Sequence, residues 1–118
     1  MRPLNICQVA AEVTPFAKTG GLGDVAAGLS RFLHRDGHDV RIFLPFYGQI
    51  ARRTETFIPV DFIQDVPLVM GDRSFTFSAR TAKLPGSEVD LYFIDCPPLF
   101  GPEGIYHGDR ADGLRFAA

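Results

Sequence analysis

The spacing of apolar residues in the first half of the chain predicts a strand, a loop, a helix and a second strand. Residues 4–11 (LNICQVAA) form a short, mostly apolar run, which is typical of a strand buried on both faces of a sheet. Residues 12–23 contain a proline and three glycines and therefore predict a loop. Residues 40–44 (VRIFL) form a second apolar run, and Pro45 ends the strand that they predict.

Between the loop and the second strand, the apolar residues change to helical spacing. Asp24 is a suitable N-cap, because its carboxylate can accept a hydrogen bond from the first free amides of a helix. Four apolar residues then predict one buried stripe: Val25, Leu29, Phe32 and Leu33. Gly37 is placed to end the helix in the left-handed conformation. A strand, a helix and a strand in this order predict two parallel strands with a right-handed crossover.

The second half of the chain predicts a β-hairpin and one more strand of the main sheet. Three runs rich in Phe, Val and Ile predict strands at residues 57–63, 66–70 and 75–82. Gly71 and Asp72 form the turn between the last two, and residues 89–94 (VDLYFI) predict a strand that returns to the main sheet. Residues 95–108 hold three prolines and three glycines and predict a long loop. Open sheets of this kind commonly have about five or six parallel strands, and this chain offers about three, so we expect a fragment of a larger domain.

The composition and charge of the chain narrow the classes of protein to which it can belong. Its 118 residues are 46% hydrophobic and 22% charged, which is typical of a globular domain and excludes a highly charged disordered chain. Twelve Lys and Arg face fourteen Asp and Glu, so we expect no nucleic-acid partner, because nucleic-acid binding needs clustered positive charge. We find neither a membrane-spanning run of about 20 apolar residues nor a signal peptide, so we expect a cytoplasmic protein without a membrane partner.

The two cysteines, Cys7 and Cys96, lie far apart in the sequence and in apolar surroundings. This placement favours two buried free thiols over a disulfide or a metal site. We therefore expect neither a metal nor a cofactor.

The segment with the most chemical information is residues 12–25 (EVTPFAKTGGLGDV), which joins the first strand to the helix. Ligands of open parallel sheets bind beyond the carboxyl ends of the strands, and the first amides of a helix attract phosphate. Gly20, Gly21 and Gly23 would let an anion approach the backbone, and Lys18 adds a full positive charge. The segment therefore predicts a binding site for a diphosphate.

Three other interpretations of these glycines have to be compared with this one. A Walker A loop is excluded, because its lysine follows the glycines and Lys18 precedes them. Gly21, Gly23 and Ala26 formally match the dinucleotide fingerprint, but that fingerprint expects an acidic residue at the end of the second strand, where residues 44–46 read LPF, so we do not expect NAD. The third alternative is a glycine-rich connection that binds no ligand.

Three motifs follow one another along the chain. The first is KTGGL followed by DV, after an E-x-x-P-F approach, in residues 12–25. The second is the GHDVR strand and its continuation from Gly37 to Tyr47, and the third runs from Tyr92 (YFID) to Tyr106. In this order, the three motifs resemble the N-terminal part of bacterial glycogen synthases and plant starch synthases. The resemblance covers nearly the whole chain, and residues 51–88 are its least diagnostic part.

The resemblance implies an α/β fold with a Rossmann-like parallel sheet, helices on both faces and a β-hairpin insertion. Residues 1–118 would form the N-terminal part of the catalytic domain of a two-domain B-type glycosyltransferase, without its C-terminal nucleotide-binding domain. It also implies retaining transfer of glucose from ADP-glucose to the non-reducing end of an α-1,4-glucan. Two alternatives remain: a related glycosyltransferase that uses UDP-glucose or another sugar donor, and a non-enzymatic nucleotide-binding module.

The resemblance also implies a role for individual residues. It makes Glu12 and Tyr106 candidates for catalytic residues. Four residues become candidates for binding ADP-glucose: Lys18, Gly20, Gly21 and Asp24. From the residues alone, Glu12 could instead cap a turn or pair with an arginine, and Asp24 could act as the helix N-cap.

Overall fold

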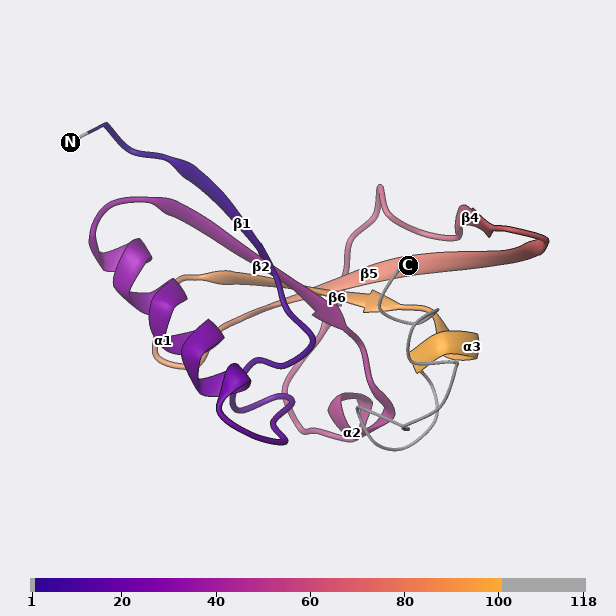
Figure 1. Ribbon diagram of the computed structural model, residues 1–118, viewed down its shortest axis with the longest axis horizontal. Helices are drawn as coiled ribbons and strands as arrows, with labels where there is room; N and C mark the ends of the chain where they lie inside the picture. Colours follow the sequence, from indigo (N-terminus) through magenta and orange to yellow (C-terminus); the bar gives the residue numbers. More distant parts are fainter. Residues whose placement is uncertain (1, 101–118) are drawn as a thin grey trace.

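The computed structural model describes residues 2–100, and within them the chain forms a six-stranded sheet with three helices (Figure 1). Only one of these helices is longer than a single turn. In chain order the elements are β1 (Asn5–Val9), α1 (Leu22–Arg35), β2 (Asp39–Pro45), α2 (Gly48–Ala51), β3 (Ile58–Pro59), β4 (Val66–Met70), β5 (Arg73–Lys83), β6 (Asp90–Asp95) and α3 (Pro97–Phe100).

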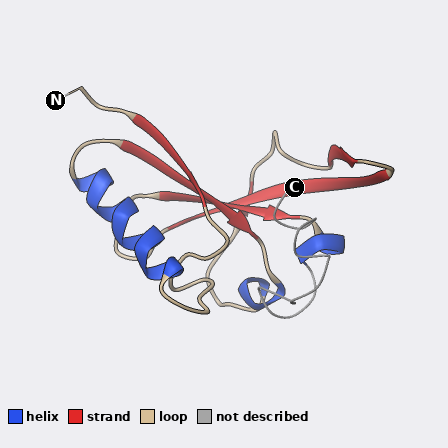
Figure 2. Cartoon of the chain, in the orientation of Figure 1, coloured by secondary structure: helices blue, strands red, loops and turns tan. Residues whose placement is uncertain are grey.

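The sheet is mixed, with a parallel half and an antiparallel half (Figure 2). Strands β1, β2 and β6 are parallel neighbours in that order, and β5 runs antiparallel to β6 on its other side. The short strand β3 and the hairpin partner β4 both pair with β5. The structure therefore confirms the α/β class, the parallel β1–α1–β2 unit and the return of residues 89–94 to the main sheet. The inserted hairpin makes the second half of the sheet antiparallel.

The core lies between α1 and one face of the parallel strands. Alternate residues of β2 and β6 are buried on this face: Val40, Ile42, Leu44, Leu91 and Phe93. They form one hydrophobic cluster with Ala26 and Ala27 of α1. Period-two burial along the strands is what a sheet covered on one face requires.

The prediction that the first strand is buried on both faces is wrong. In β1, Ile6 and Gln8 are partly buried on the side of α1, whereas Cys7 and Val9 on the opposite side are exposed. Val9 is 82% exposed, because no helix within residues 2–100 covers that side of β1. Of the two thiols predicted to be buried, only that of Cys96 is buried. Helices on both faces of the sheet therefore stay a prediction for the longer protein.

Helix α1 has the predicted position but buries a different face. The expected stripe lies mainly on the surface, where Val25, Leu29 and Phe32 are 63%, 45% and 60% exposed. The buried residues of the helix are small: Gly23, Ala26, Ala27 and Ser30. Small side chains let the helix axis approach the strands closely. The spacing of hydrophobic residues does not show that this close approach is needed, so it predicts the wrong face.

The ends of α1 are partly as predicted. Gly37, with a φ of +97°, follows the last turn in the left-handed conformation, which confirms the predicted helix end. The N-cap is Gly21 instead of Asp24, because the helix begins at Leu22 and Asp24 lies within its first turn. The Asp24 side chain is therefore available for contacts with the preceding loop.

The hairpin matches its prediction closely. Strand β4 has the predicted bounds, β5 extends the prediction to Arg73–Lys83, and Gly71 has a φ of +63° in the turn. Only Ile58–Pro59 of the strand expected over residues 57–63 forms. After β3 the chain turns, and the Ile63 amide donates a hydrogen bond of 3.0 Å to the Val60 carbonyl oxygen. None of the helices in residues 2–100 is both long enough and apolar enough to cross a membrane.

Candidate functional site

The segment between β1 and α1 lies beyond the carboxyl end of β1, at the edge where β2 and β6 also end (Figure 1). Its first half is anchored in the core, because Val13, Phe16 and Ala17 are at most 2% exposed. The Phe16 ring packs edge-on against Phe93 of β6, with 5.2 Å between the ring centroids. Residues 18–22, by contrast, are exposed. The loop therefore presents a short exposed tip on a rigid base.

Two residues that follow β2 hold this base through its carbonyl groups. The Tyr47 hydroxyl, which is fully buried, donates a hydrogen bond of 2.8 Å to the Ala11 carbonyl oxygen. The Arg53 guanidinium donates one of 3.2 Å to the Pro15 carbonyl oxygen and lies 5.1 Å from the centre of the Phe16 ring. The sequence predicts neither role. No local spacing signals them, because the contacts join segments 36 and 38 residues apart.

Glu12 lies at the start of the loop and is buried, with 3% of its surface exposed. Its Oε1 accepts hydrogen bonds from the Thr19 amide at 2.6 Å and the Gly20 amide at 3.3 Å. Hydrogen bonds to backbone amides are what a buried carboxylate needs, since burying an unpaired charge is costly. The carboxylate therefore binds the tip of its own loop.

The three glycines of the loop have different roles. At Gly20 and Gly21 an added Cβ would meet nothing within 4 Å, so the backbone is open to a ligand. At Gly23 an added Cβ would lie 2.9 Å from the Thr14 Oγ1 and 3.0 Å from the Ala17 carbonyl oxygen. The prediction that Gly23 also opens the backbone to an anion is therefore wrong. Gly23 lets the start of α1 pack against the loop.

Lys18 and Asp24 form the charged part of the exposed tip. The Lys18 Nζ lies 2.7 Å from Asp24 Oδ2, and the two side chains are 48% and 52% exposed. The Thr14 hydroxyl donates a hydrogen bond of 2.7 Å to the other carboxylate oxygen. The hydrogen bond from Lys18, and after it the one from Thr14, lowers the pKa of Asp24. Lys18 is thus held at the start of α1, beside the open backbone of the two glycines.

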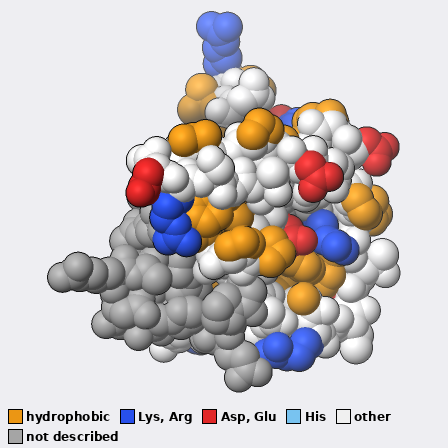
Figure 3. Space-filling view, turned by 90° about the vertical axis from the view of Figure 1, so that its right-hand side faces the viewer, with side chains coloured by type: hydrophobic (Ala, Val, Ile, Leu, Met, Phe, Trp, Pro, Cys, Tyr) orange, Lys and Arg blue, Asp and Glu red, His pale blue; other side chains and the backbone are white. Residues whose placement is uncertain are grey.

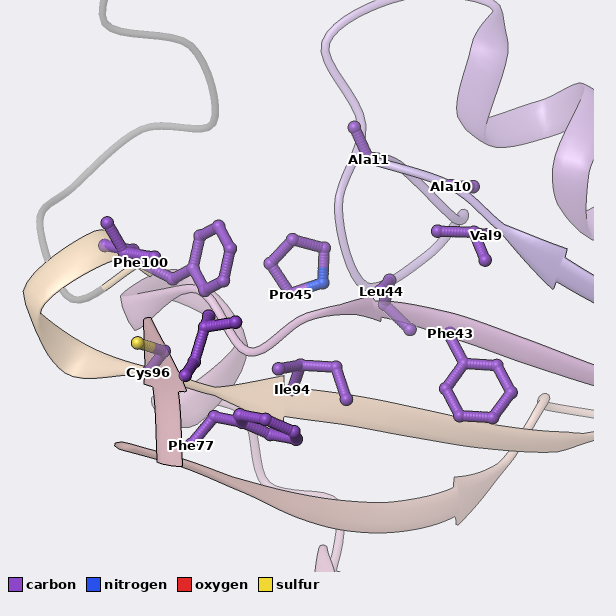
Figure 4. A pocket seen from close by; sticks show the side chains of 12 residues that line it. Val9, Ala10, Ala11, Phe43, Leu44, Pro45, Phe77, Ile94, Cys96 and Phe100 are labelled. Carbon is purple, nitrogen blue, oxygen red and sulfur yellow. The ribbon is translucent and has the colours of Figure 1, made fainter. Parts of the chain in front are cut away.

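An apolar cavity of about 420 Å³ lies next to this loop, on the side of the sheet opposite α1. Figure 4 shows Phe43, Ile94 and Phe77, from three different strands, along one wall, with Phe100 of α3 at one end and Val9 at the other. Figure 3 shows hydrophobic side chains gathered between charged ones on one end of the molecule. The cavity lining is apolar, so it suits an apolar occupant and does not suit a diphosphate.

The structure brings five of the six predicted site residues together in one loop and the first turn of α1: Glu12, Lys18, Gly20, Gly21 and Asp24. Tyr106 lies outside the described residues. Within residues 2–100, no group of three or more His, Cys, Asp or Glu side chains lies close enough together to hold a metal ion. Lys18 and the open backbone at Gly20 and Gly21 offer charge and hydrogen bonding toward an anion.

Comparison with known proteins gives a consistent result over nearly the whole chain. Residues 5–118 match the family described as the starch synthase catalytic domain. A glycogen synthase from Moorella thermoacetica is 38% identical over 117 residues, which are 98% of this chain and 23% of that protein. A glycogen synthase from Aeromonas hydrophila subsp. hydrophila is 41% identical over 121 residues, covering 99% of this chain and 24% of the relative.

A solved structure supports the same assignment. The catalytic domain of starch synthase IV from Arabidopsis thaliana, bound to ADP and acarbose, superposes with a TM-score of 0.81 at 29% identity. The match covers 98% of this chain and 23% of that one, so the chain spans about a quarter of the length of the proteins it matches. The family match over residues 5–118 and the identity to the glycogen synthases show that this chain belongs to the starch synthase catalytic-domain family.

Proposed function

We propose that this chain supplies the donor-diphosphate site of a glycogen or starch synthase. The whole enzyme would transfer glucose from ADP-glucose to the non-reducing end of an α-1,4-glucan, with retention of configuration. Family membership and the glycogen synthase relatives support the reaction. The ADP in the starch synthase IV structure supports adenine as the base of the donor nucleotide, and the acarbose there supports a carbohydrate acceptor.

The observation that carries the proposal is the arrangement at the start of α1. Lys18 lies beside two glycines whose backbone is open, and the helix begins at Leu22 behind them. A helix N-terminus contributes about half a positive charge through its unpaired amides. Lys18 and these amides together form a seat for two phosphate groups. Their charge would stabilise the nucleoside diphosphate as it leaves the glucosyl group.

The remaining parts of the enzyme would come from the longer protein. The relatives are about four times as long as the region that matches, and the site described here is a single loop with one helix start. We propose that a second, C-terminal domain closes over this loop, binds the rest of the nucleotide and completes the acceptor site. The Lys18–Asp24 ion pair would then open as the diphosphate takes the place of the Asp24 carboxylate.

The test is a pair of lysine variants in the full-length protein. We expect Lys18→Ala to lower kcat/KM for ADP-glucose by about a hundredfold, because it removes a cation that faces developing charge. Lys83→Ala is the matched control. Lys83 is 54% exposed and also pairs with an aspartate, since its Nζ lies 2.6 Å from Asp90, but it lies on β5.

The control variant should keep kcat/KM within about twofold of the wild type. Glucan elongation is followed by transfer of labelled glucose to glycogen, with ADP-glucose and UDP-glucose compared as donors. Equal losses in the two lysine variants would contradict the phosphate role of Lys18. A clear preference for UDP-glucose would contradict the proposed donor.

A further inference from the structure

The carboxylate of Glu12 links the two ends of the loop between β1 and α1 (residues 10–21), which we call the donor loop. Its backbone follows β1, and its Oε1 accepts the amides of Thr19 and Gly20, seven and eight residues further along the chain. The two hydrogen bonds fold the tip of the loop back onto the end of β1. Because one carboxylate oxygen accepts two successive amides, this contact determines the path of the backbone between Lys18 and the helix.

The base from which Glu12 acts is rigid. Its neighbour Val13 is fully buried, and the carbonyl of its other neighbour Ala11 accepts the Tyr47 hydroxyl at 2.8 Å. The Thr14 amide also donates a hydrogen bond of 3.1 Å to the Gly23 carbonyl oxygen at the start of α1. The position of the carboxylate is therefore fixed by the core of the domain, and the exposed tip takes its position from the carboxylate.

These contacts divide the amides of the loop between two anions. The amides of Thr19 and Gly20 point inward to Glu12. The side of Gly20 and Gly21 on which a Cβ would lie is open, and the Lys18–Asp24 pair is about half exposed. A diphosphate on the open side would therefore bind Lys18 and the first amides of α1. It would not reach the amides that Glu12 already binds.

We propose that Glu12 is a positioning residue, which fixes the conformation of the donor loop by binding the Thr19 and Gly20 amides and does not itself contact the reacting atoms. Only 3% of its surface is exposed, which leaves almost no carboxylate surface for a substrate. The identity of the ligand, a donor diphosphate, rests on the proposed function, whereas the effect of Glu12 on the loop conformation does not. The reach of the side chain, more than its charge, is what matters for this role.

Whether the length or the charge of the side chain matters can be tested with Glu12→Gln and Glu12→Asp in the full-length protein. Glutamine keeps the length of the side chain and a carbonyl oxygen that can accept both amides, but it has no charge. Aspartate keeps the charge but is one methylene shorter, so it cannot reach both amides from the same backbone position. A residue that acted through its charge would tolerate aspartate better than glutamine.

The first readout is amide hydrogen exchange in the peptide that covers residues 18–22, which does not depend on activity. We expect exchange in Glu12→Asp to be about tenfold faster than in the wild type, because both amides lose their acceptor. In Glu12→Gln we expect exchange within about threefold of the wild type. Equal protection in all three proteins would overturn the proposal, and so would a greater loss of protection in Glu12→Gln than in Glu12→Asp.

The second readout separates binding from chemistry. We expect Glu12→Asp to weaken ADP binding by about tenfold and to raise the KM for ADP-glucose, with a smaller change in kcat. Glu12→Gln should keep most of the ADP affinity and of the turnover. A large loss of kcat in Glu12→Gln with unchanged ADP affinity would overturn the proposal, because it would indicate a direct part in the chemistry. If no variant, nor the wild type, used ADP-glucose, the proposed function would fail while the exchange experiment still tested Glu12.

Discussion

At the scale of single residues, the site depends on two carboxylates that bind different parts of one loop. Glu12 is buried and binds backbone amides, whereas Asp24 is half exposed and binds the Lys18 side chain. An exposed ion pair adds little to the stability of a fold, because solvent screens both charges. Under the proposed function, Lys18 would therefore leave Asp24 for an incoming diphosphate at a small cost, while the loop backbone would keep its shape.

This difference leads to a prediction about pH. The hydrogen bond from Lys18 is the first cause of the lowered pKa of Asp24. A carboxylate whose pKa is lower in the folded state stabilises the fold above its unfolded pKa, and this contribution is lost as the pH falls through the folded value. We expect Lys18→Ala to lower the thermal midpoint slightly at pH 7. The difference from the wild type should shrink as the pH falls through the acidic range in which Asp24 becomes protonated.

The measurement is a series of thermal unfolding curves of both proteins between neutral and acidic pH. Lys83→Ala provides a comparison, since Lys83 also pairs with an aspartate at 2.6 Å. A difference between wild type and Lys18→Ala that grows on acidification would show that the Lys18–Asp24 contact does not lower the Asp24 pKa.

At the scale of the elements, the position of α1 depends on small residues. The helix packs against the sheet and the loop through Gly23, Ala26, Ala27 and Ser30, whereas Val25, Leu29 and Phe32 are exposed. The close approach at Gly23 holds the start of the helix against Thr14 and Ala17 of the loop that also carries Gly20 and Gly21. The packing of the helix therefore determines the geometry of the candidate site.

Two glycines of α1 allow a direct test of this packing. We expect Gly23→Ala to destabilise the protein by about 1–3 kcal/mol, because the new Cβ would lie 2.9 Å from Thr14 Oγ1 and 3.0 Å from a backbone oxygen. Gly28→Ala is the control. It lies on the exposed side of the same helix, its Cβ would meet nothing within 4 Å, and alanine should stabilise the helix by up to about 1 kcal/mol. Urea unfolding of the two variants measures both values, and a neutral Gly23→Ala would show that the helix start has room to move.

At the scale of the whole molecule, residues 2–100 form one covered face and one open face of a sheet. The covered face packs against α1, and the open side holds the apolar cavity of about 420 Å³ and the exposed Val9. Phe43 and Tyr92 stack on each other within the sheet, with 5.0 Å between their ring centroids, and both remain partly exposed. The donor loop lies at the edge between these two faces.

We predict that residues 1–118, produced alone, do not catalyse glucan elongation. The described part of the site supplies one lysine, the helix start and a positioning carboxylate, and these groups can hold a diphosphate but do not position an acceptor. The assay is transfer of labelled glucose from ADP-glucose to glycogen, with the full-length protein as the positive control. Measurable elongation by residues 1–118 would show that the second domain is not required.

The sequence by itself determined the order of elements and the position of the loop that carries the candidate site residues. Spacing, glycines and prolines act locally, so the β1–α1–β2 unit, the β4–β5 hairpin and the loop with Lys18, Gly20 and Gly21 could all be predicted. Only the tertiary structure decided which face of α1 is buried, that β1 is exposed on one side, that Gly23 serves packing and that Tyr47 and Arg53 hold the loop. Each of these depends on how closely segments distant in the sequence approach one another, and the one-dimensional pattern of polar and apolar residues does not contain that distance.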